Sequence, residues 1–126
     1  MATIGQRIKC RAAVAYGPNK PLVVEDIYVD PPKSGEIRLK IIGSGICRSD
    51  LHILDTNIAN DFVFPLIMGH EGSGIVESIG PNVTTVSVGD HVIPLWIPKC
   101  QKCRLCRSNK TNLCETGIRV NAKSFQ

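Results

Sequence analysis

The chain has 126 residues, of which 43% are hydrophobic and 21% charged, and its formal net charge is +4. This length supports one hydrophobic core, so we expect a single domain spanning residues 1–126. Its sequence has no run of about 18 apolar residues and no basic head followed by an apolar segment. We therefore expect no membrane span, no secretory leader and a cytoplasmic location.

Glycine and proline content favours short strands over long helices. The sequence contains 11 Gly and 8 Pro, and only 5% of its residues are aromatic, which is typical of many short strands joined by tight turns. We therefore expect a mainly β fold with a closed or nearly closed barrel. Local patterns predict strands at Ile8–Tyr16, Leu22–Val29, Glu36–Ile42, Ser73–Ile79 and His91–Leu95.

The clearest alternation of apolar and charged residues lies in the third of these strands. Ile37, Leu39 and Ile41 should face one way, and Arg38 and Lys40 the other. The pattern predicts a half-buried strand.

A short helix is expected directly after this strand, because apolar residues recur near helical spacing within 46–54. The linking sequence GSGICR begins like a dinucleotide-binding fingerprint. However, Arg48 stands where that fingerprint needs its third glycine, so we reject this interpretation.

The strongest metal-binding signal lies near the C-terminal end. Cys100, Cys103, Cys106 and Cys114 follow the spacing C-x2-C-x2-C-x7-C, in which short spacers let neighbouring sulfurs converge on one ion. Four sulfurs leave no open coordination position, so we predict a structural zinc lobe at about residues 96–116. An iron–sulfur cluster and disulfide bonds are the alternatives.

Basic residues are interleaved with these cysteines, at Lys99, Lys102, Arg104, Arg107 and Lys110. Zinc held by four thiolates carries a formal charge of about −2. We interpret the basic residues as local charge compensation and expect no nucleic-acid partner. A basic docking surface is the alternative.

A sparser set of candidate ligands lies upstream. Cys47 opens the expected helix, and His70 lies in the glycine-flanked sequence GHEGSG. Each residue also has a purely structural explanation: Cys47 could be a buried free cysteine, and His70 could be a hydrogen-bonded loop histidine. Nearby Glu71, Ser49 and His52 strengthen the pair, because a carboxylate orients metal ligands and hydroxyl and imidazole groups relay protons. Cys10 and His91 have no such neighbours, and we interpret them as structural.

Three sequence blocks together resemble one family. These are GICRSDLH, GHEGSGIVESIGPNV and GDHVIPLWIPKCQKCRLCRSNKTNLC, which cover most of the chain from about Lys9 to Cys114. Their order and spacing resemble the zinc-containing alcohol dehydrogenases of the medium-chain dehydrogenase/reductase superfamily, especially the animal-type enzymes. The resemblance implies a GroES-like, partly closed β-barrel with a short helix and a four-cysteine zinc lobe.

The resemblance also implies a catalytic zinc and the residues around it. Cys47 and His70 match two of its three protein ligands, and Glu71 matches the acid beneath it. Ser49 matches the hydroxyl that hydrogen-bonds the alcohol, and His52 matches the outer group of the proton relay.

Two further residues match positions that contact organic ligands. Arg48 matches a residue that contacts the pyrophosphate of NAD, and Trp96 matches a residue that forms an aromatic wall of the substrate pocket. Without the resemblance, some of the matched residues have a structural explanation. Ser49 would form a hydrogen bond at the start of the helix, His52 would be a solvated residue on the helix, and Trp96 would be part of the core. The function implied is NAD-dependent interconversion of small alcohols with aldehydes or ketones by hydride transfer.

The chain also departs from the family pattern. The third catalytic-zinc ligand, a cysteine, and the Rossmann coenzyme domain, which also forms the family's homodimer interface, have no counterpart in these 126 residues. We therefore expect the N-terminal part of a catalytic domain that is inactive alone. A non-catalytic, zinc-stabilised GroES-like binding module is the alternative.

Overall fold

A computed structural model describes residues 3–55 and 62–117, in which strands predominate over short helices. The strands are β1 (Ile8–Ala15), β2 (Val23–Val29), β3 (Ile37–Ser44), β4 (Leu66–Ile67), β5 (Gly72–Ile79) and β6 (His91–Val92). The labelled helices are α1 (Arg48–Leu54) and α2 (Arg104–Arg107), and residues 115–117 are also helical. The expectation of a mainly β fold is therefore confirmed.

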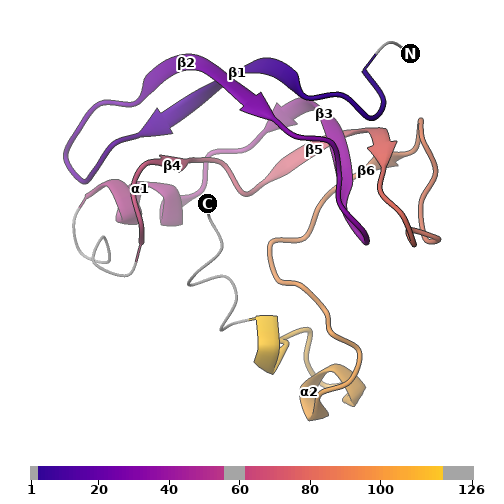
Figure 1. The fold of residues 1–126 in the computed structure, drawn as a ribbon. Helices are drawn as coiled ribbons and strands as arrows, with labels where there is room; N and C mark the ends of the chain where they lie inside the picture. The colour runs from indigo at the N-terminus through magenta and orange to yellow at the C-terminus, as the bar shows by residue number, and fades with distance from the viewer. Residues whose placement is uncertain (1–2, 56–61, 118–126) are drawn as a thin grey trace.

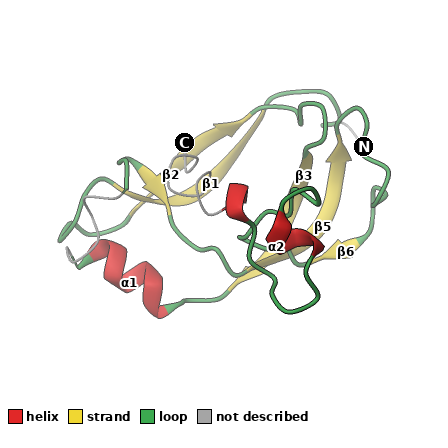
Figure 2. Ribbon diagram, turned by 90° about the horizontal axis from the view of Figure 1, so that it is seen from below, coloured by secondary structure: helices red, strands yellow, loops and turns green. Residues whose placement is uncertain are grey.

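The strands form two separate antiparallel sheets, with the orders β2-β1-β4 and β3-β5-β6 (Figure 1). Within the described ranges these sheets do not join into a closed barrel. In Figure 2, α1 lies at one end of the molecule and the β3-β5-β6 sheet at the other. No helix within the described ranges has the length and apolar character needed to cross a membrane.

The last expected strand is shorter than predicted. Strand β6 stops at Val92, whereas the sequence pattern suggested strand as far as Leu95. Pro94 has no backbone N–H to donate to a sheet, and Ile93 and Leu95 are 73% and 83% exposed. Ile93 and Leu95 therefore lie in a loop, which passes beside the candidate ligands Cys47 and His70.

Arg38 is buried, which corrects the expectation that it faces solvent. The side chain is only 5% exposed and donates to Glu77 Oε2 at 2.6 Å. Its terminal nitrogens also donate to the backbone carbonyls of Thr3 and Gln6, each at 2.7 Å. A buried arginine requires such partners, so this cluster joins the start of β3 to β5 and to the N-terminal segment.

The apolar core is small and lies around β1, β4 and β5. Its buried members include Val14, Ala15, Ile53, Leu66 and Val76. Cys114 is the only buried apolar side chain among the described residues that follow β6, and this segment extends below the sheets (Figure 1). This segment therefore has little core of its own.

Candidate metal centres

The upstream site forms where β3 ends, α1 begins and β5 begins. Cys47 precedes the first residue of α1, and His70 and Glu71 precede the first residue of β5. The backbone N–H of Gly45 donates to the carbonyl of Glu71 at 3.0 Å, which fixes the β3 end against the β5 start. Residues 23 and 24 positions apart in sequence thus meet at one place.

Asp50 fixes the start of the helix and was missed by the sequence analysis. Its Oδ2 accepts the backbone N–H of Cys47 at 3.0 Å, while its own N–H donates to the Cys47 carbonyl at 3.1 Å. This reciprocal pair is a capping arrangement in which the third helical residue returns to the cap. The C-x-x-D spacing was the only sequence signal for it.

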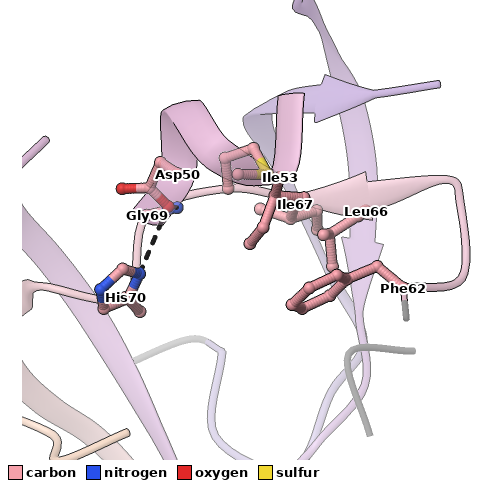
Figure 3. A pocket seen from close by; sticks show the side chains of 8 residues that line it. Asp50, Ile53, Phe62, Leu66, Ile67, Gly69 and His70 are labelled. Atoms are coloured by element: carbon pink, nitrogen blue, oxygen red, sulfur yellow. Dashed lines mark hydrogen bonds and ion pairs between the residues drawn. The ribbon is translucent and has the colours of Figure 1, made fainter. Parts of the chain in front are cut away.

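The same carboxylate orients His70. Asp50 is 6% exposed, and its Oδ1 lies 3.3 Å from His70 Nδ1 (Figure 3). Because a carboxylate only accepts hydrogen bonds, Nδ1 carries the proton and Nε2 keeps a lone pair for another partner. Behind the pair is a small cavity of about 40 Å³ with apolar lining from Ile53, Phe62 and Leu66. This arrangement is typical of metal-binding histidines, whose second nitrogen is held by a carboxylate.

Ser49 lies between the two upstream ligands. Its hydroxyl oxygen is 3.1 Å from Cys47 Sγ and 3.2 Å from His70 Nε2, so its single proton can be donated to one of these two acceptors at a time. The hydroxyl therefore sits where it can exchange a proton with a group bound at the site.

Glu71 completes a three-residue group of metal-ligating atoms. One carboxylate oxygen of Glu71, Cys47 Sγ and a ring nitrogen of His70 all lie within 4.8 Å of one another. The sequence analysis assigned Glu71 to an outer position and found no third ligand. In the folded chain this carboxylate is near enough to both ligands to coordinate the same ion.

These side chains line an open pocket of about 410 Å³. The apolar wall comes from the loop after β6, at Ile93, Pro94, Leu95 and Trp96. The Trp96 ring is tilted by 60° to the His70 ring, with centroids 6.0 Å apart. The pocket thus combines convergent polar groups with an apolar wall, as small-molecule sites commonly do.

Two of the sequence-predicted residues stand apart from this group. Arg48 is exposed at the first position of α1. His52 lies in the last turn of the same helix, and the Ser49 hydroxyl bonds to Cys47 and His70 instead of to His52. A proton relay from Ser49 to His52 would therefore need another group between them.

The four downstream cysteines converge as predicted. Their sulfurs lie within 4.8 Å of one another, and Cys100 Sγ and Cys106 Sγ are 3.9 Å apart. A zinc ion with Zn–S bonds of about 2.3 Å separates tetrahedral sulfurs by about 3.8 Å. Within the described residues all cysteines are free, so the disulfide alternative finds no support there.

Backbone amides point at these sulfurs and stabilise thiolates. The N–H of Cys103 donates to Cys100 Sγ at 3.4 Å, that of Cys106 to Cys103 Sγ at 3.3 Å, and that of Gly117 to Cys114 Sγ at 3.2 Å. Backbone N–H groups, led by that of Lys102, lower the pKa of the Cys100 thiol to about 6. Burial, followed by the hydrogen bond with the Cys103 side chain, instead raises the pKa of the Cys106 thiol to about 11. The metal-free lobe therefore offers a thiolate at Cys100 and a thiol proton at Cys106 that a bound metal must displace.

The neighbouring basic residues are exposed. Lys99, Lys102, Arg107 and Lys110 lie on the lobe surface, and Arg104 pairs with Glu115 at 3.6 Å. Their role in compensating the charge of a metal held by the four sulfurs stays a prediction.

Fold and ligand chemistry together define the class: a small β protein with one closed, four-sulfur metal site and one open site of mixed ligands. The model of the alcohol dehydrogenase GroES-like domain matches residues 33–124. The chain therefore belongs to this family, as the resemblance of its sequence motifs predicted.

Individual relatives agree with this assignment. The chain is 57% identical over 120 residues to an alcohol dehydrogenase class-3 from Dictyostelium discoideum, covering 95% of this chain and 31% of that protein. It is 51% identical over 113 residues to an S-(hydroxymethyl)glutathione dehydrogenase from Candida maltosa, covering 90% of this chain and 29% of that one.

A solved structure gives the same result. The alcohol dehydrogenase zinc-binding domain protein from Burkholderia ambifaria superposes with a TM-score of 0.73 and 34% identity, over 80% of this chain and 26% of that one. The chain thus spans about a third, or less, of the length of the relatives it matches.

Proposed function

We propose that these residues form the metal-binding part of the active site of an NAD-dependent zinc alcohol dehydrogenase, which interconverts alcohols with aldehydes or ketones by hydride transfer. The observation that carries the proposal is the upstream group itself. Cys47, His70 and Glu71 converge within 4.8 Å at the base of a pocket that also contains Ser49.

The donor set fits zinc. One sulfur, one imidazole nitrogen and one carboxylate oxygen are common zinc ligands, and three protein ligands leave a fourth position open. Ligand atoms around tetrahedral zinc lie about 3.3 to 3.8 Å apart, so a contraction of about 1 Å from the present spacing is sufficient. Zinc held there would act as a Lewis acid that polarises the oxygen of a bound alcohol or aldehyde.

Ser49 is proposed to move the proton of the alcohol. Its hydroxyl sits beside both upstream ligands and is uncharged, so it can accept and pass on a proton without leaving a buried charge. His52, one helical turn further on, is proposed to deliver the proton to solvent through an intervening group. Asp50 holds His70 by its Nδ1 and so keeps its Nε2 directed to the site.

Trp96 is proposed as a wall for the organic part of the substrate, and Arg48 as a contact to the NAD pyrophosphate. The pocket wall is apolar, whereas its base holds the polar groups, which suits a small molecule with one oxygen function. The named relatives suggest two substrates for testing, a simple primary alcohol and S-(hydroxymethyl)glutathione.

Further polypeptide is proposed to complete this site. Ile42, Ile46, Ile93 and Leu95 are between 64% and 87% exposed, and Trp96 on the same loop is 55% exposed. Large exposed apolar side chains around one site mark a surface that other protein covers. In the longer protein we place there a Rossmann coenzyme domain and the third ligand of the family pattern, a cysteine, which would replace Glu71 on the ion so that the fourth position stays open. We also propose a homodimeric assembly and a cytoplasmic location.

The test uses a protein that continues through those regions, with NADH formation followed by its absorbance. We expect NAD-dependent oxidation of ethanol or S-(hydroxymethyl)glutathione, abolished by Cys47→Ala and reduced about 10²-fold or more by Ser49→Ala. His52→Gln should slow turnover only a few-fold, since solvent partly replaces an outer relay group. The matched control is Cys10→Ala, because Cys10 lies in β1 and belongs to neither group of metal-ligating residues.

Undiminished turnover by Cys47→Ala would contradict the assigned roles. An extended protein that binds zinc but oxidises no alcohol would favour the non-catalytic module. The 126-residue chain by itself should oxidise no alcohol in the same assay.

A further inference from the structure

The glycines of the GSG sequence, rejected as a dinucleotide fingerprint, lie directly beside the upstream ligands. Gly43 lies near the end of β3 and Gly45 just beyond it. We propose that Gly45 is a positioning residue, which leaves the space that the Glu71 side chain needs to join Cys47 and His70. This inference rests on the upstream metal site proposed above.

The space in question is small and specific. A β-carbon at position 45 would lie 2.3 Å from Glu71 Oε2, 3.2 Å from Glu71 Cβ and 3.4 Å from Glu71 Cδ. Nonbonded carbon and oxygen atoms at optimal separation lie well beyond 3 Å. An alanine at position 45 would therefore force the carboxylate away from its present place.

A β-carbon at position 45 would collide with one side chain and not with the backbone of the sheet. At Gly74 and Gly80 the nearest atoms to an added β-carbon are backbone oxygens, Lys40 O at 2.6 Å and Lys33 O at 1.8 Å. At Gly45 all three nearest atoms belong to Glu71. Gly74 and Gly80 thus permit close packing of the backbone, whereas Gly45 sets where a carboxylate can go.

Among the residues that the structure describes, none forms a hydrogen bond or ion pair with the Glu71 carboxylate. Glu71 is exposed, and its carbonyl, not its carboxylate, accepts the N–H of Gly45. An exposed glutamate with three rotatable bonds samples many positions unless its surroundings limit them. The bare Cα of Gly45 allows the present position, in which the carboxylate lies within 4.8 Å of both other ligand atoms.

Gly43 provides a matched control on the same strand. A β-carbon there would meet only Ser73 Oγ, at 3.9 Å, which is an ordinary contact. Neither Gly43 nor Gly45 has a positive φ, so alanine introduces no backbone strain at either position. The two substitutions differ mainly in their effect on Glu71.

The experiment measures Co²⁺ binding at the upstream site after one equivalent of Zn²⁺ has filled the four-cysteine lobe. The absorbance from Cys47 thiolate to Co²⁺ reports the upstream site, and zinc content reports the lobe. Gly45→Ala should weaken Co²⁺ binding about 10- to 100-fold, the usual effect of losing a group that orients a ligand. Gly43→Ala should bind Co²⁺ like the unsubstituted chain, and zinc in the lobe should stay unchanged in both.

A double-mutant cycle with Glu71→Gln separates positioning from a general structural role. In the Glu71→Gln background, Gly45→Ala should cause little further loss, because the carboxylate that it displaces is already gone. Equal losses in both backgrounds, an unweakened Gly45→Ala variant, or a Gly45→Ala variant that fails to fold would each overturn the inference. If the unsubstituted chain binds no Co²⁺ beyond the lobe zinc, the proposed upstream metal site itself is wrong, and the inference falls with it.

Discussion

The two groups of metal-ligating side chains obtain their geometry in different ways. The lobe takes four ligands from 15 consecutive residues, arranged by local N–H···S hydrogen bonds around the four-residue helix α2. The upstream site takes Cys47, His70 and Glu71 from the ends of separate elements that two sheets hold in place.

The two regions therefore depend on different interactions for their structure, the lobe on bound metal and the upstream site on the fold around it. Besides the lobe's ligands themselves, little of the lobe is buried, so the bound ion must supply much of the energy that orders it. The upstream site is instead built by strand pairing, helix capping and the buried Asp50. Metal should therefore be essential to the structure of the lobe and dispensable for the structure of the upstream site.

The largest expected effect comes from removing one lobe ligand. Cys103→Ser should lose the tightly held zinc together with the cooperative folding of the lobe, because structural zinc contributes on the order of 10 kcal/mol in small domains. Metal analysis and heteronuclear NMR measure the two losses. Cys10→Ser is the control, and a Cys103→Ser variant that keeps both zinc and folded lobe would refute the four-sulfur assignment.

The next effect concerns the sheets that hold the upstream site. Arg38→Met removes the cation of a buried ion pair and leaves the Glu77 carboxylate with only the hydroxyls of Thr3 and Ser78, so the free energy of unfolding should fall by about 3 to 5 kcal/mol. Lys9→Met is the matched control, since its pair with Asp26 is more than half exposed and should matter by less than about 1 kcal/mol. Urea denaturation of zinc-loaded protein compares them, and equal effects would contradict the role given to Arg38.

A smaller effect should separate the two metal sites by affinity. Asp50→Asn keeps the shape of the side chain but weakens its hold on His70 Nδ1 and Cys47 N–H. We expect about tenfold weaker Co²⁺ binding at the upstream site with unchanged zinc in the lobe. Asp26→Asn, an exposed change, should alter neither site, and a loss of lobe zinc in Asp50→Asn would show that the two sites are not independent.

The last prediction uses acid to weaken the sheets gradually. The hydrogen bond from Arg38, helped by those from Thr3 and Ser78, lowers the pKa of Glu77 from 4.5 to about 2 against the opposing effect of burial. A depressed pKa in the folded state means that this stabilisation is complete above about pH 4.5 and is lost as the pH falls towards 2.

Metal loss in acid is common to all variants, so the measurement compares denaturation of the unsubstituted chain with Glu77→Gln. The stability difference between them should shrink steadily between pH 4.5 and 2. A difference that is independent of pH in this range would contradict the paired, ionised state of Glu77.

Local sequence determined the features that depend on neighbours along the chain. The spacing of Cys100, Cys103, Cys106 and Cys114 predicted the lobe, because short spacers bring sulfurs together by themselves. Alternation and turn residues located most of the strands, and the helix after β3 was placed within two residues of its start. The two-residue β4 and the four-residue α2 were missed, because such short elements carry no periodic signal.

Tertiary structure alone decided which polar groups meet. Arg38 had the pattern of a solvent-facing residue, yet Glu77 and the carbonyls of the N-terminal segment satisfy it inside the protein. Asp50 was inconspicuous until β5 brought His70 to its carboxylate. Glu71 and Gly45 meet only because β3 and β5 pair in one register. Contacts between distant segments depend on how strands pair and where the chain turns back, and local spacing carries little information about either.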